Sequence, residues 1–218
     1  MMGHICVVLG GGGHARILID ALQSCGGIKL YGVLDINSTL WGESLLGVPI
    51  LGGDNLLPEL IEDGVNCFVV GLGSIGDNTP RKSLFDLGST SKLYPFTVIH
   101  SSAIYSRWSS IGPGVQLLSG SIVNAGVKLG TNVIINSGAI VEHDCVIGDH
   151  VHVATGARLA STVTVGEGAH IGVGATVKQS VSIGEYAIVG AGAVVVKDVL
   201  PNSVVAGVPA RPMQSSRG

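Results

Sequence analysis

The stretch NSGAIVEHDCVIGDHVHVATGA, residues 136–157, carries an aliphatic residue at every sixth position. Val141 and Ile147 mark this period, which runs without an insertion from Ile111 to Val195. A six-residue period fits neither the helical turn of about 3.6 residues nor the two-residue alternation of a strand. It is typical of short strands joined by tight turns around a triangular prism.

Three hexapeptides make one coil of such a prism, so residues 18 positions apart stack on one another. The fifteen hexapeptides from residue 111 onward predict about five coils. The aliphatic residues fill the interior. The residue four positions after each of them is mostly Ala or Val, which suits a corner where space is short.

The first hundred residues differ in kind from the prism. HICVVLG (4–10) predicts a short buried strand, GGGG (10–13) a tight turn and HARILIDALQSC (14–25) an amphipathic helix. LYGVLD (30–35) predicts a second strand. This part of the chain therefore begins as a β-α-β unit.

The turn of this unit carries the pattern G-x-G-x-x-A at Gly10, Gly12 and Ala15. Glycines let the backbone approach a pyrophosphate, whose charge the amino terminus of a helix favours. Asp35, at the end of the second strand, can accept hydrogen bonds from a ribose or a base. A tight turn that binds no ligand remains the alternative at this point.

A third strand at NCFVVGLG (66–73) and a helix at DNTPRKSLFDLG (77–88) extend the unit into a Rossmann-like α/β domain. We place this domain at residues 1–97 and the prism at residues 98–218. Fewer than a hundred residues make half of a two-part dinucleotide fold, which excludes a hydride-transfer enzyme. A nucleotide linked to something smaller, such as a sugar, fits better.

Composition excludes other classes of partner. The net charge is −3 and Lys and Arg do not cluster, so we predict no nucleic acid partner. No basic amphipathic stretch and no apolar run of membrane-span length occur, so we predict no membrane partner. The amino terminus lacks a positive n-region, and the four cysteines show no metal spacing, which predicts a reduced, cytoplasmic protein.

The prism resembles the left-handed parallel β-helix of the hexapeptide-repeat acyltransferases. The closing segment SVVAGVPARPM (203–213) is similar to the one that ends many of them. This resemblance implies a homotrimer with active sites between subunits. It also implies that acetyl-CoA lies in the groove between neighbouring prisms.

A second, more specific resemblance rests on the core E-H-[DE]-C-x-I-G, present at 142–148, with GGGGHARILIDAL, VLD, GDNTPRK and AGVPARPM. Together these segments resemble the bacterial nucleotide-sugar acetyltransferases. That family includes UDP-4-amino-sugar and GDP-perosamine N-acetyltransferases and relatives described as sialic acid O-acetyltransferases. The resemblance covers nearly the whole chain. It implies acetyl-CoA-dependent N-acetylation of a UDP- or GDP-linked 4-amino-6-deoxy sugar, such as perosamine or a bacillosamine precursor, with O-acetylation of a sialic acid or related sugar as the alternative.

The resemblance implies that His143 is the general base, that Asp144 orients or polarises it, and that Asn136 faces the amino group or the base. The chemistry agrees, because an amine that attacks a thioester must lose a proton and a neutral imidazole accepts one near pH 7. His143 is third in its hexapeptide, between the inward Val141 and Cys145, so we expect it to point outward. We expect direct transfer, with Cys145 a core residue rather than a nucleophile.

The resemblance implies that His152 contacts the cofactor near its thioester; a solvated position beside His170 is the alternative. His150 has no counterpart and is predicted at the surface. Asp35 is followed by Ile36 where many relatives carry a second acid, which leaves uracil or guanine open as the base. We expect acetyl-CoA to lie also against Ala160, Ser161, Gly172, Val173 and Ala191. We expect the nucleotide sugar to contact Gly12, Gly13, His14, Arg16, Asp35 and Gly73.

Two other functions occur as rivals on such a prism. In zinc-dependent carbonic anhydrases of this architecture two histidine ligands lie two coils apart. Gln179 lies 36 positions after His143, and Asn136 lies 36 positions after His100, so the spacing is absent and we predict no metal. The other rival is a non-catalytic module that senses a nucleotide sugar. It predicts that removal of His143 changes nothing measurable.

Overall fold

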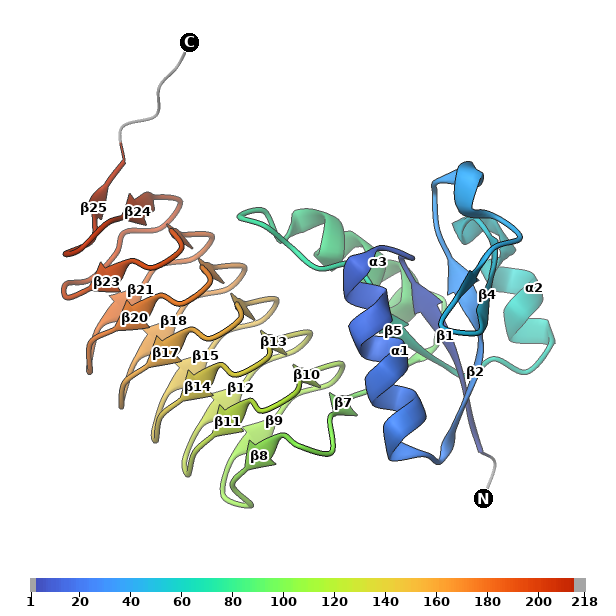
Figure 1. Ribbon diagram of the computed structural model, residues 1–218, viewed down its shortest axis with the longest axis horizontal. Helices are drawn as coiled ribbons and strands as arrows, with labels where there is room; N and C mark the ends of the chain where they lie inside the picture. Colours follow the sequence, from blue (N-terminus) through green and yellow to red (C-terminus); the bar gives the residue numbers. More distant parts are fainter. Residues whose placement is uncertain (1–2, 214–218) are drawn as a thin grey trace, which may run out of the picture. The chain divides into compact units, whose positions relative to one another are not determined.

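The computed structural model describes residues 3–213, apart from the side chain of Cys25. The chain divides into two compact units (Figure 1). The α/β unit comprises the chain up to Gly73 and Pro80–Ser101, and the β-helix unit comprises Ser74–Thr79 and the chain from Ser102 onward. Within residues 3–213, none of the helices combines the length and the apolar character that a bilayer crossing needs.

A mostly parallel sheet with the strand order β3-β4-β2-β1-β5-β6 forms the centre of the α/β unit. Only β3 runs antiparallel to its neighbour. The carboxyl-terminal half of β1 is fully buried because strands pair with it on both sides. The strands are β1 (His4–Leu9), β2 (Ile28–Leu34), β3 (Ser44–Leu45), β4 (Val48–Gly52), β5 (Cys67–Val70) and β6 (Tyr94–Pro95). β7 (Val98–Ile99) follows them in the chain.

Helices accompany this sheet, and they supply aromatic and aliphatic side chains to its core. The Phe68 and Phe85 rings lie 5.5 Å apart between their centroids. Gly88 makes this packing possible, because a Cβ there would lie 2.7 Å from the Phe68 ring. The α-helices are α1 (Gly13–Cys25), α2 (Leu57–Glu62) and α3 (Thr79–Thr90), with short 3-10 helices η1 (Ser38–Leu40) and η2 (Asp54–Leu56).

Two predicted elements end at other residues than expected. The strand predicted at 66–73 ends at Val70, because Gly71 turns closely against Gly10. The helix predicted at 77–88 begins at Thr79, because the Asp77 carboxylate accepts the Thr79 N–H at 2.8 Å. The sequence prediction missed β3, β4 and α2, which are short and leave little periodicity.

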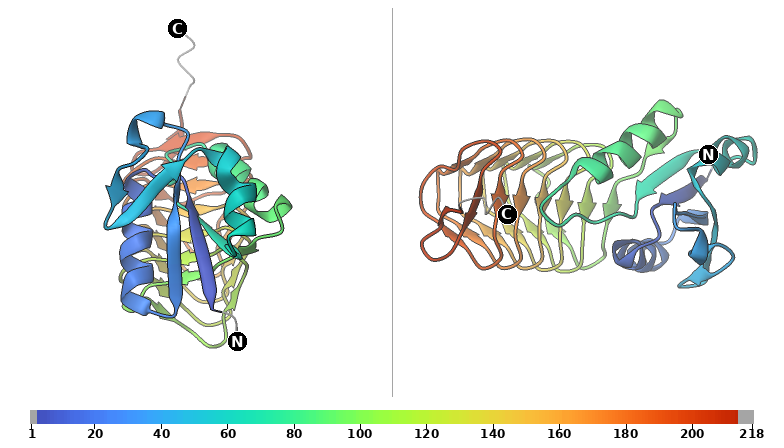
Figure 2. Two further views of the ribbon diagram at one scale, coloured as in Figure 1. Left: turned by 90° about the vertical axis from the view of Figure 1, so that its right-hand side faces the viewer. Right: turned by 90° about the horizontal axis from the view of Figure 1, so that it is seen from above.

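The β-helix unit follows the period of six. Its strands are mostly two residues long, and each pairs in parallel with strands 18 residues away: His152 pairs with Ile134 and with His170. Three sheets result, and the coils form a left-handed parallel β-helix whose successive rungs are visible in Figure 2. The predicted fold class is therefore confirmed.

Each sheet collects every third strand. We call the first the histidine sheet; it contains β10 (Gln116–Leu117), β13 (Ile134–Ile135), β16 (His152–Val153), β19 (His170–Ile171), β22 (Ile188–Val189), β24 (Val204–Ala206) and the antiparallel β25 (Arg211–Pro212). The second contains β8 (Ile104–Tyr105), β11 (Ile122–Val123), β14 (Ile140–Val141), β17 (Arg158–Leu159), β20 (Thr176–Val177) and β23 (Val194–Val195). The third contains β9 (Ser110–Ile111), β12 (Lys128–Leu129), β15 (Val146–Ile147), β18 (Thr164–Val165) and β21 (Ser182–Ile183).

The interior of the coils consists of the two predicted inward positions. Val141 and Cys145 are fully buried, as are their equivalents in neighbouring coils. The Cys145 thiol donates to the Ala160 carbonyl at 3.2 Å, and burial raises the pKa of this thiol. Cys145 is thus a core residue, as predicted.

One predicted surface residue is buried. His150 is 5% exposed, because it lies at a corner directly above Asn132 in the preceding coil, and the Asn132 amide nitrogen is 3.0 Å from His150 Nδ1. The expectation that His150 lies at the surface was wrong. A corner residue with a polar partner one coil away can be buried, which hexapeptide counting alone does not show.

Candidate active site and nucleotide pocket

In the glycine-rich turn of the α/β unit, Gly10 is closely packed, whereas Gly12 and Gly13 are open to their surroundings. Gly10 has a φ of 95°, and its N–H donates to the Leu34 carbonyl at 2.8 Å. A Cβ at Gly12 or Gly13 would meet nothing within 4 Å, so the start of α1 is open. Backbone N–H groups at an open helix start favour an anion.

A cavity of about 320 Å³ lies beside this turn. Two carboxylates line it, Asp35 at the end of β2 and Asp54 at the start of η2. Burial, and then the charge of Asp35, raise the pKa of Asp54. The remaining lining residues are Gly10, Leu34, Ile36, Leu72, Pro80, Ser83, Leu84 and Leu87.

The two carboxylates differ in their partners. Asp35 accepts the Gly11 N–H at 2.6 Å and the Asn37 N–H at 2.8 Å, and so fixes the turn and the loop after β2. Among the described residues no hydrogen bond to Asp54 offsets the desolvation of its carboxylate. Asp54 was not predicted from the sequence. Its position at the cavity can be inferred only when β4 is recognised as a strand of the same sheet.

The other residues predicted for the nucleotide sugar are spread around the turn. His14 lies against Gly73, where an added Cβ would be 3.3 Å from the His14 Cβ. Arg16 is exposed on α1. The end of β5 is fixed by Arg81, which is buried and donates to the Val70 and Leu72 carbonyls at 3.0 and 2.8 Å. Asp35 is the only predicted contact that lines the cavity itself.

The predicted general base is exposed at a corner after the second sheet. The His143 and Asp144 side chains are 56% and 63% exposed, and His143 Nδ1 lies 2.9 Å from Asp144 Oδ2. Because a carboxylate only accepts, Nδ1 carries the proton in the neutral ring and Nε2 keeps its lone pair. The outward orientation expected for His143 is observed.

Gly126, one coil below, makes room for this pair. Asp144 has a φ of 59°, and its N–H donates to the Ala125 carbonyl at 3.0 Å. A Cβ on Gly126 would overlap the Asp144 carboxylate. Sequence reasoning did not single out Gly126, because its role is visible only when the coils are stacked.

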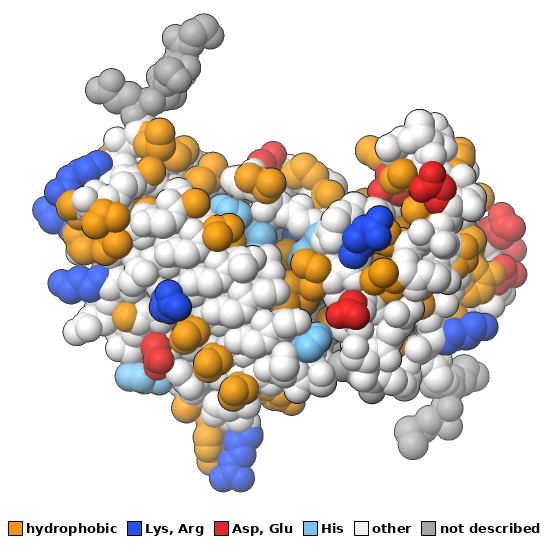
Figure 3. Space-filling model, viewed as in Figure 1, with side chains coloured by type: hydrophobic (Ala, Val, Ile, Leu, Met, Phe, Trp, Pro, Cys, Tyr) orange, Lys and Arg blue, Asp and Glu red, His pale blue; other side chains and the backbone are white. Residues whose placement is uncertain are grey.

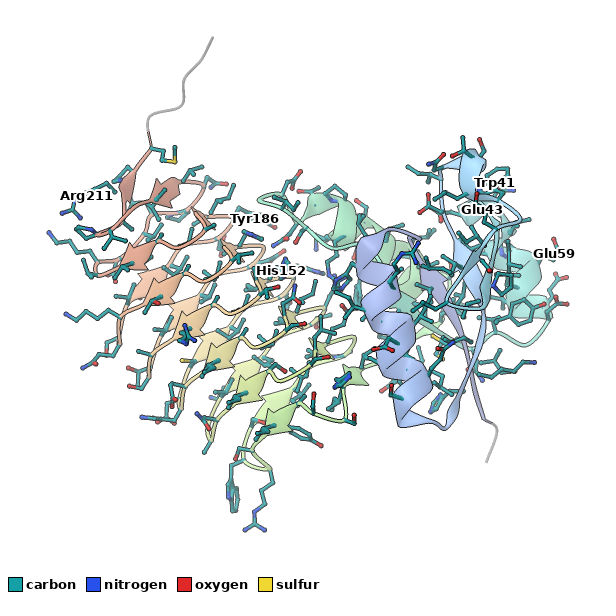
Figure 4. All side chains as sticks on the ribbon, in the orientation of Figure 1. Trp41, Glu43, Glu59, His152, Tyr186 and Arg211 are labelled. Carbon is teal, nitrogen blue, oxygen red and sulfur yellow. The ribbon has the colours of Figure 1, made fainter. Side chains whose placement is uncertain are left out.

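His152 lies in the histidine sheet and is 5% exposed (Figure 4). Asn136 Oδ1 accepts the Ser137 N–H at 2.8 Å, which turns its Nδ2 toward His152 Nε2 at 3.0 Å. His152 Nε2 therefore accepts, and Nδ1–H donates to the Ser74 carbonyl at 3.1 Å. Within one chain Asn136 contacts His152 and not His143.

A second cavity, of about 220 Å³, lies over the β-helix beneath Ile75 and Gly76; we call it the slot. Asn78 holds the segment above it, because its Nδ2 donates to the Gly168 and Ala169 carbonyls at 2.9 and 3.1 Å. The slot is otherwise lined by His170, Gly172, Val173, Ile188, Val189, Gly190 and Ala191.

The predicted cofactor contacts fall at two corners. Gly172, Val173 and Ala191 line the slot at the corner after the histidine sheet. Ala160 and Ser161 lie at the corner after the second sheet, one coil above His143. At this corner the Thr162 N–H donates to the His143 carbonyl at 3.0 Å. One chain thus carries the base at one corner and the slot at another.

The slot is lined by uncharged side chains and backbone, whereas the corner of His143 carries the exposed carboxylate of Asp144. On the face in Figure 3 the β-helix presents mostly backbone and uncharged side chains, with histidines reaching the surface in several places. Among residues 3–213 no group of three or more His, Cys, Asp and Glu side chains converges as metal ligands do.

His143 Nε2 keeps its lone pair, and another corner of the β-helix carries the narrow apolar slot. These two features suit acyl transfer from a thioester. The hexapeptide-repeat acyltransferases are the class with this architecture. Residues 162–197 match the bacterial transferase hexapeptide model (six repeats), and residues 6–87 match the PglD N-terminal domain. The chain belongs to the PglD-like hexapeptide-repeat acetyltransferase family and is an acetyltransferase.

Solved structures resemble the whole chain. A mutant of perosamine N-acetyltransferase from Caulobacter crescentus, in complex with CoA and GDP-perosamine, is 38% identical with a TM-score of 0.91, covering 99% of each chain. The acetyltransferase domain of PglB from Neisseria gonorrhoeae FA1090 is 30% identical, with a TM-score of 0.89, over 96% of this chain and 100% of that one. WeeI from Acinetobacter baumannii AYE is 28% identical, with a TM-score of 0.82 and the same coverage. A comparison with curated protein sequences gave no match.

Proposed function

We propose that the chain transfers the acetyl group of acetyl-CoA to the amine of a nucleotide-linked 4-amino-6-deoxy sugar. The exposed His143 and Asp144 pair, with Nδ1 and Oδ2 2.9 Å apart, is the observation that carries this proposal. The Caulobacter crescentus structure holds CoA and GDP-perosamine, and the Neisseria gonorrhoeae domain has a structure with acetyl coenzyme A. Both support the proposal.

In the proposed reaction the sugar amine attacks the thioester carbonyl. His143 Nε2 accepts the proton that the amine loses, and Asp144 stabilises the imidazolium that forms. Backbone N–H groups at the coil corners hold the oxyanion of the tetrahedral intermediate. The intermediate then collapses, the thiolate of CoA leaves and takes up a proton, and the acetyl group stays on the sugar nitrogen.

The nucleotide is proposed to bind in the α/β unit. The open start of α1 at Gly12 and Gly13 faces the pyrophosphate, and the base enters the 320 Å³ cavity. Among residues 3–213, no hydrogen bond reaches the Asp54 carboxylate. Guanine offers two adjacent donors, N1–H and the N2 amino group, whereas uracil offers one N–H between two carbonyls. This arrangement favours a GDP-linked sugar.

The active site is proposed to form between copies of the chain in a homotrimer. His143 at one corner and the slot at another do not meet within one chain. In a trimer the His143 corner of one copy faces the slot and Asn136 of the next. Acetyl-CoA then lies between two copies.

A thiol-release assay tests the reaction. The chain is given acetyl-CoA with UDP- and GDP-linked 4-amino-6-deoxy sugars and, in a separate arm, free sialic acid. We expect turnover with a nucleotide amino sugar. Turnover with sialic acid alone overturns the assignment of the substrate, and absence of turnover with every acceptor overturns the proposed function.

A binding assay tests the base. We expect Asp54→Asn to weaken GDP about tenfold through the lost charge-assisted bond and to leave UDP unchanged. Asn55→Ala, one residue further along η2, is the matched control. Equal weakening of both nucleotides contradicts a role for Asp54 in recognising guanine.

A further inference from the structure

Arg107 lies at the corner of the β-helix that carries the proposed base, and the proposed reaction does not use it. Strand pairing fixes its position, because Tyr105 pairs with Val123 and Val123 pairs with Val141. Arg107 follows Tyr105 by two residues, as His143 follows Val141. Arg107 therefore takes the place of His143 two coils lower.

The backbone of the turn that carries Arg107 is tied down by three hydrogen bonds. The Trp108 N–H donates to Ser106 Oγ at 3.2 Å, and Ser109 Oγ donates to the Ser106 carbonyl at 2.6 Å. The Trp108 carbonyl accepts the Gly126 N–H at 3.3 Å, which joins the turn to the next coil. These bonds fix the point from which the Arg107 side chain projects.

The guanidinium of Arg107 lies over an exposed indole. Its Cζ is 4.9 Å from the centroid of the Trp108 ring, which is a cation–π contact. Trp108 is 70% exposed, and Arg107 is exposed as well. Among residues 3–213 no carboxylate pairs with Arg107. A guanidinium held on an aromatic face without a carboxylate is available to an anion.

The coil between Arg107 and His143 contributes only small residues to this corner. They are Ala125 and Gly126. Two coil spacings add up to about 10 Å, because neighbouring parallel strands lie about 4.8 Å apart. No long side chain of the intervening coil separates the cation from the imidazole. A molecule of about this length can therefore contact both.

The acceptor of the proposed reaction has the required length and charge. The predicted acetyl-CoA contacts Ala160 and Ser161 lie one coil above His143, so the acceptor extends toward the lower coils. The C4 amine of a hexose and the diphosphate on its C1 lie at opposite ends of the ring. With the amine at His143, the diphosphate comes within reach of the Arg107 side chain. Guanidinium groups bind phosphates through two parallel N–H bonds.

We propose that Arg107 binds the diphosphate of the acceptor whose amine His143 deprotonates, and that Trp108 positions the guanidinium for this contact. This inference rests on the proposed function, since that function supplies the acceptor. Arg107 and His143 of one copy then hold the two ends of the same sugar. Arg107 thereby determines specificity, because a free amino sugar reaches His143 alone and lacks the group that Arg107 binds.

Steady-state kinetics of the full chain with acetyl-CoA and two acceptors tests the proposal. One acceptor is GDP-perosamine or a UDP-linked 4-amino-6-deoxy sugar, whichever the wild type turns over. The other is the same amino sugar without its nucleotide diphosphate. Arg107→Gln removes the charge, and Arg107→Lys keeps it. Lys29→Gln, which removes an exposed positive charge near the start of β2, is the matched control.

We expect Arg107→Gln to raise the KM for the nucleotide sugar about tenfold, which is the effect of one hydrogen bond to a charged group. The kcat and the KM for acetyl-CoA are expected to change little. Arg107→Lys is expected to restore much of the loss, and Lys29→Gln to behave as the wild type. With the free amino sugar, Arg107→Gln and the wild type are expected to have equal kcat/KM.

Two kinetic results overturn the proposal. One is an unchanged KM for the nucleotide sugar in Arg107→Gln. The other is an equal loss with the free amino sugar, which indicates a structural effect.

Substitutions of Trp108 test its positioning role. We expect Trp108→Leu to raise the KM for the nucleotide sugar about threefold, because the guanidinium loses the aromatic face that holds it. Trp108→Phe keeps such a face and is expected to restore most of the loss. Sedimentation velocity is measured for every variant. A changed oligomeric state in Arg107→Gln or Trp108→Leu overturns the proposal, because it places the pair in a contact between copies.

Calorimetric titration with the two nucleotide sugars, without acetyl-CoA, separates this proposal from the proposed function. If the wild type turns over no amino sugar, but Arg107→Gln weakens the binding of a nucleotide sugar, the proposed reaction is wrong and the Arg107 contact stands. If turnover occurs and Arg107→Gln leaves both KM and binding unchanged, only the Arg107 contact is wrong. If the wild type neither binds nor turns over a nucleotide sugar, both are wrong.

Discussion

Three histidines of the β-helix unit differ in environment because their nearest polar atoms differ. His143 is exposed beside a carboxylate, so its Nε2 is bare. His152 is buried between Ser74 and Asn136, so both its nitrogens are occupied. His170 has one buried nitrogen without a partner. Residue type alone does not distinguish the three histidines, whereas their contacts do.

Burial lowers the pKa of His170, which has a consequence for stability at acid pH. As the pH falls below about 6.5, the unfolded chain takes up a proton at this residue and the folded chain does not. The free energy of unfolding therefore decreases through this window. In His170→Phe this contribution is absent, while His152, whose ring lies edge-on to residue 170, is present in both proteins.

The measurement is urea unfolding of both proteins at pH 7.5 and at pH 5.5. We expect the unfolding midpoint of the wild type to fall further between the two pH values than that of His170→Phe. Equal decreases in the two proteins show that burial does not hold His170 neutral.

At the scale of the element, the hexapeptide pattern alone determined much of the β-helix. The inward positions, the 18-residue register and the outward direction of His143 were all predicted, because each follows from counting along a regular coil. The segment Ser74–Thr79 could not be predicted. Its place in the β-helix unit depends on Ser74 and Asn78, each bonded to groups more than 70 residues away in sequence. Asp54 was missed because its position near Asp35 depends on β4, a strand that the sequence did not predict.

Because Gly126 lies one coil below Asp144, a substitution at Gly126 tests the carboxylate beside the proposed base. Gly126→Ala places a methyl group where the Asp144 carboxylate lies, so the carboxylate must move away from His143. We expect kcat to fall about tenfold while the KM for acetyl-CoA changes little, because the imidazolium loses its partner.

Gly120→Ala is the matched control for this change. Gly120 has a φ of 67°, close to the 75° of Gly126, but a Cβ there meets nothing within 4 Å. Both variants carry the same backbone strain, and only one displaces Asp144. Equal kcat values in the two variants contradict a role for the carboxylate.

At the scale of the whole molecule, the proposed base and the slot lie at different corners of the β-helix unit. The β-helix carries the base at one corner and the slot at another, and the glycine-rich turn belongs to the α/β unit. The proposed site between copies would bring the two corners of the β-helix unit together. The proposed site between copies could be anticipated from the sequence only through the family resemblance. Contacts between copies produce no periodic pattern of residues.

Mixed oligomers test a shared site. His143→Gln removes the base, and His152→Ala removes the contact that holds Asn136. We expect each variant alone to be nearly inactive, and oligomers assembled from equal amounts of both to recover about a quarter of wild-type activity, because that share of sites combines two intact halves. A mixture no more active than its components contradicts a site between copies.

In the proposed reaction, His143 takes the proton from the attacking amine. The most direct test is kcat for thiol release by His143→Gln beside the wild type and His4→Gln, with CoA affinity measured in parallel. We predict a fall in kcat of about 100-fold or more in His143→Gln alone, with CoA affinity unchanged. A wild-type kcat in His143→Gln contradicts it.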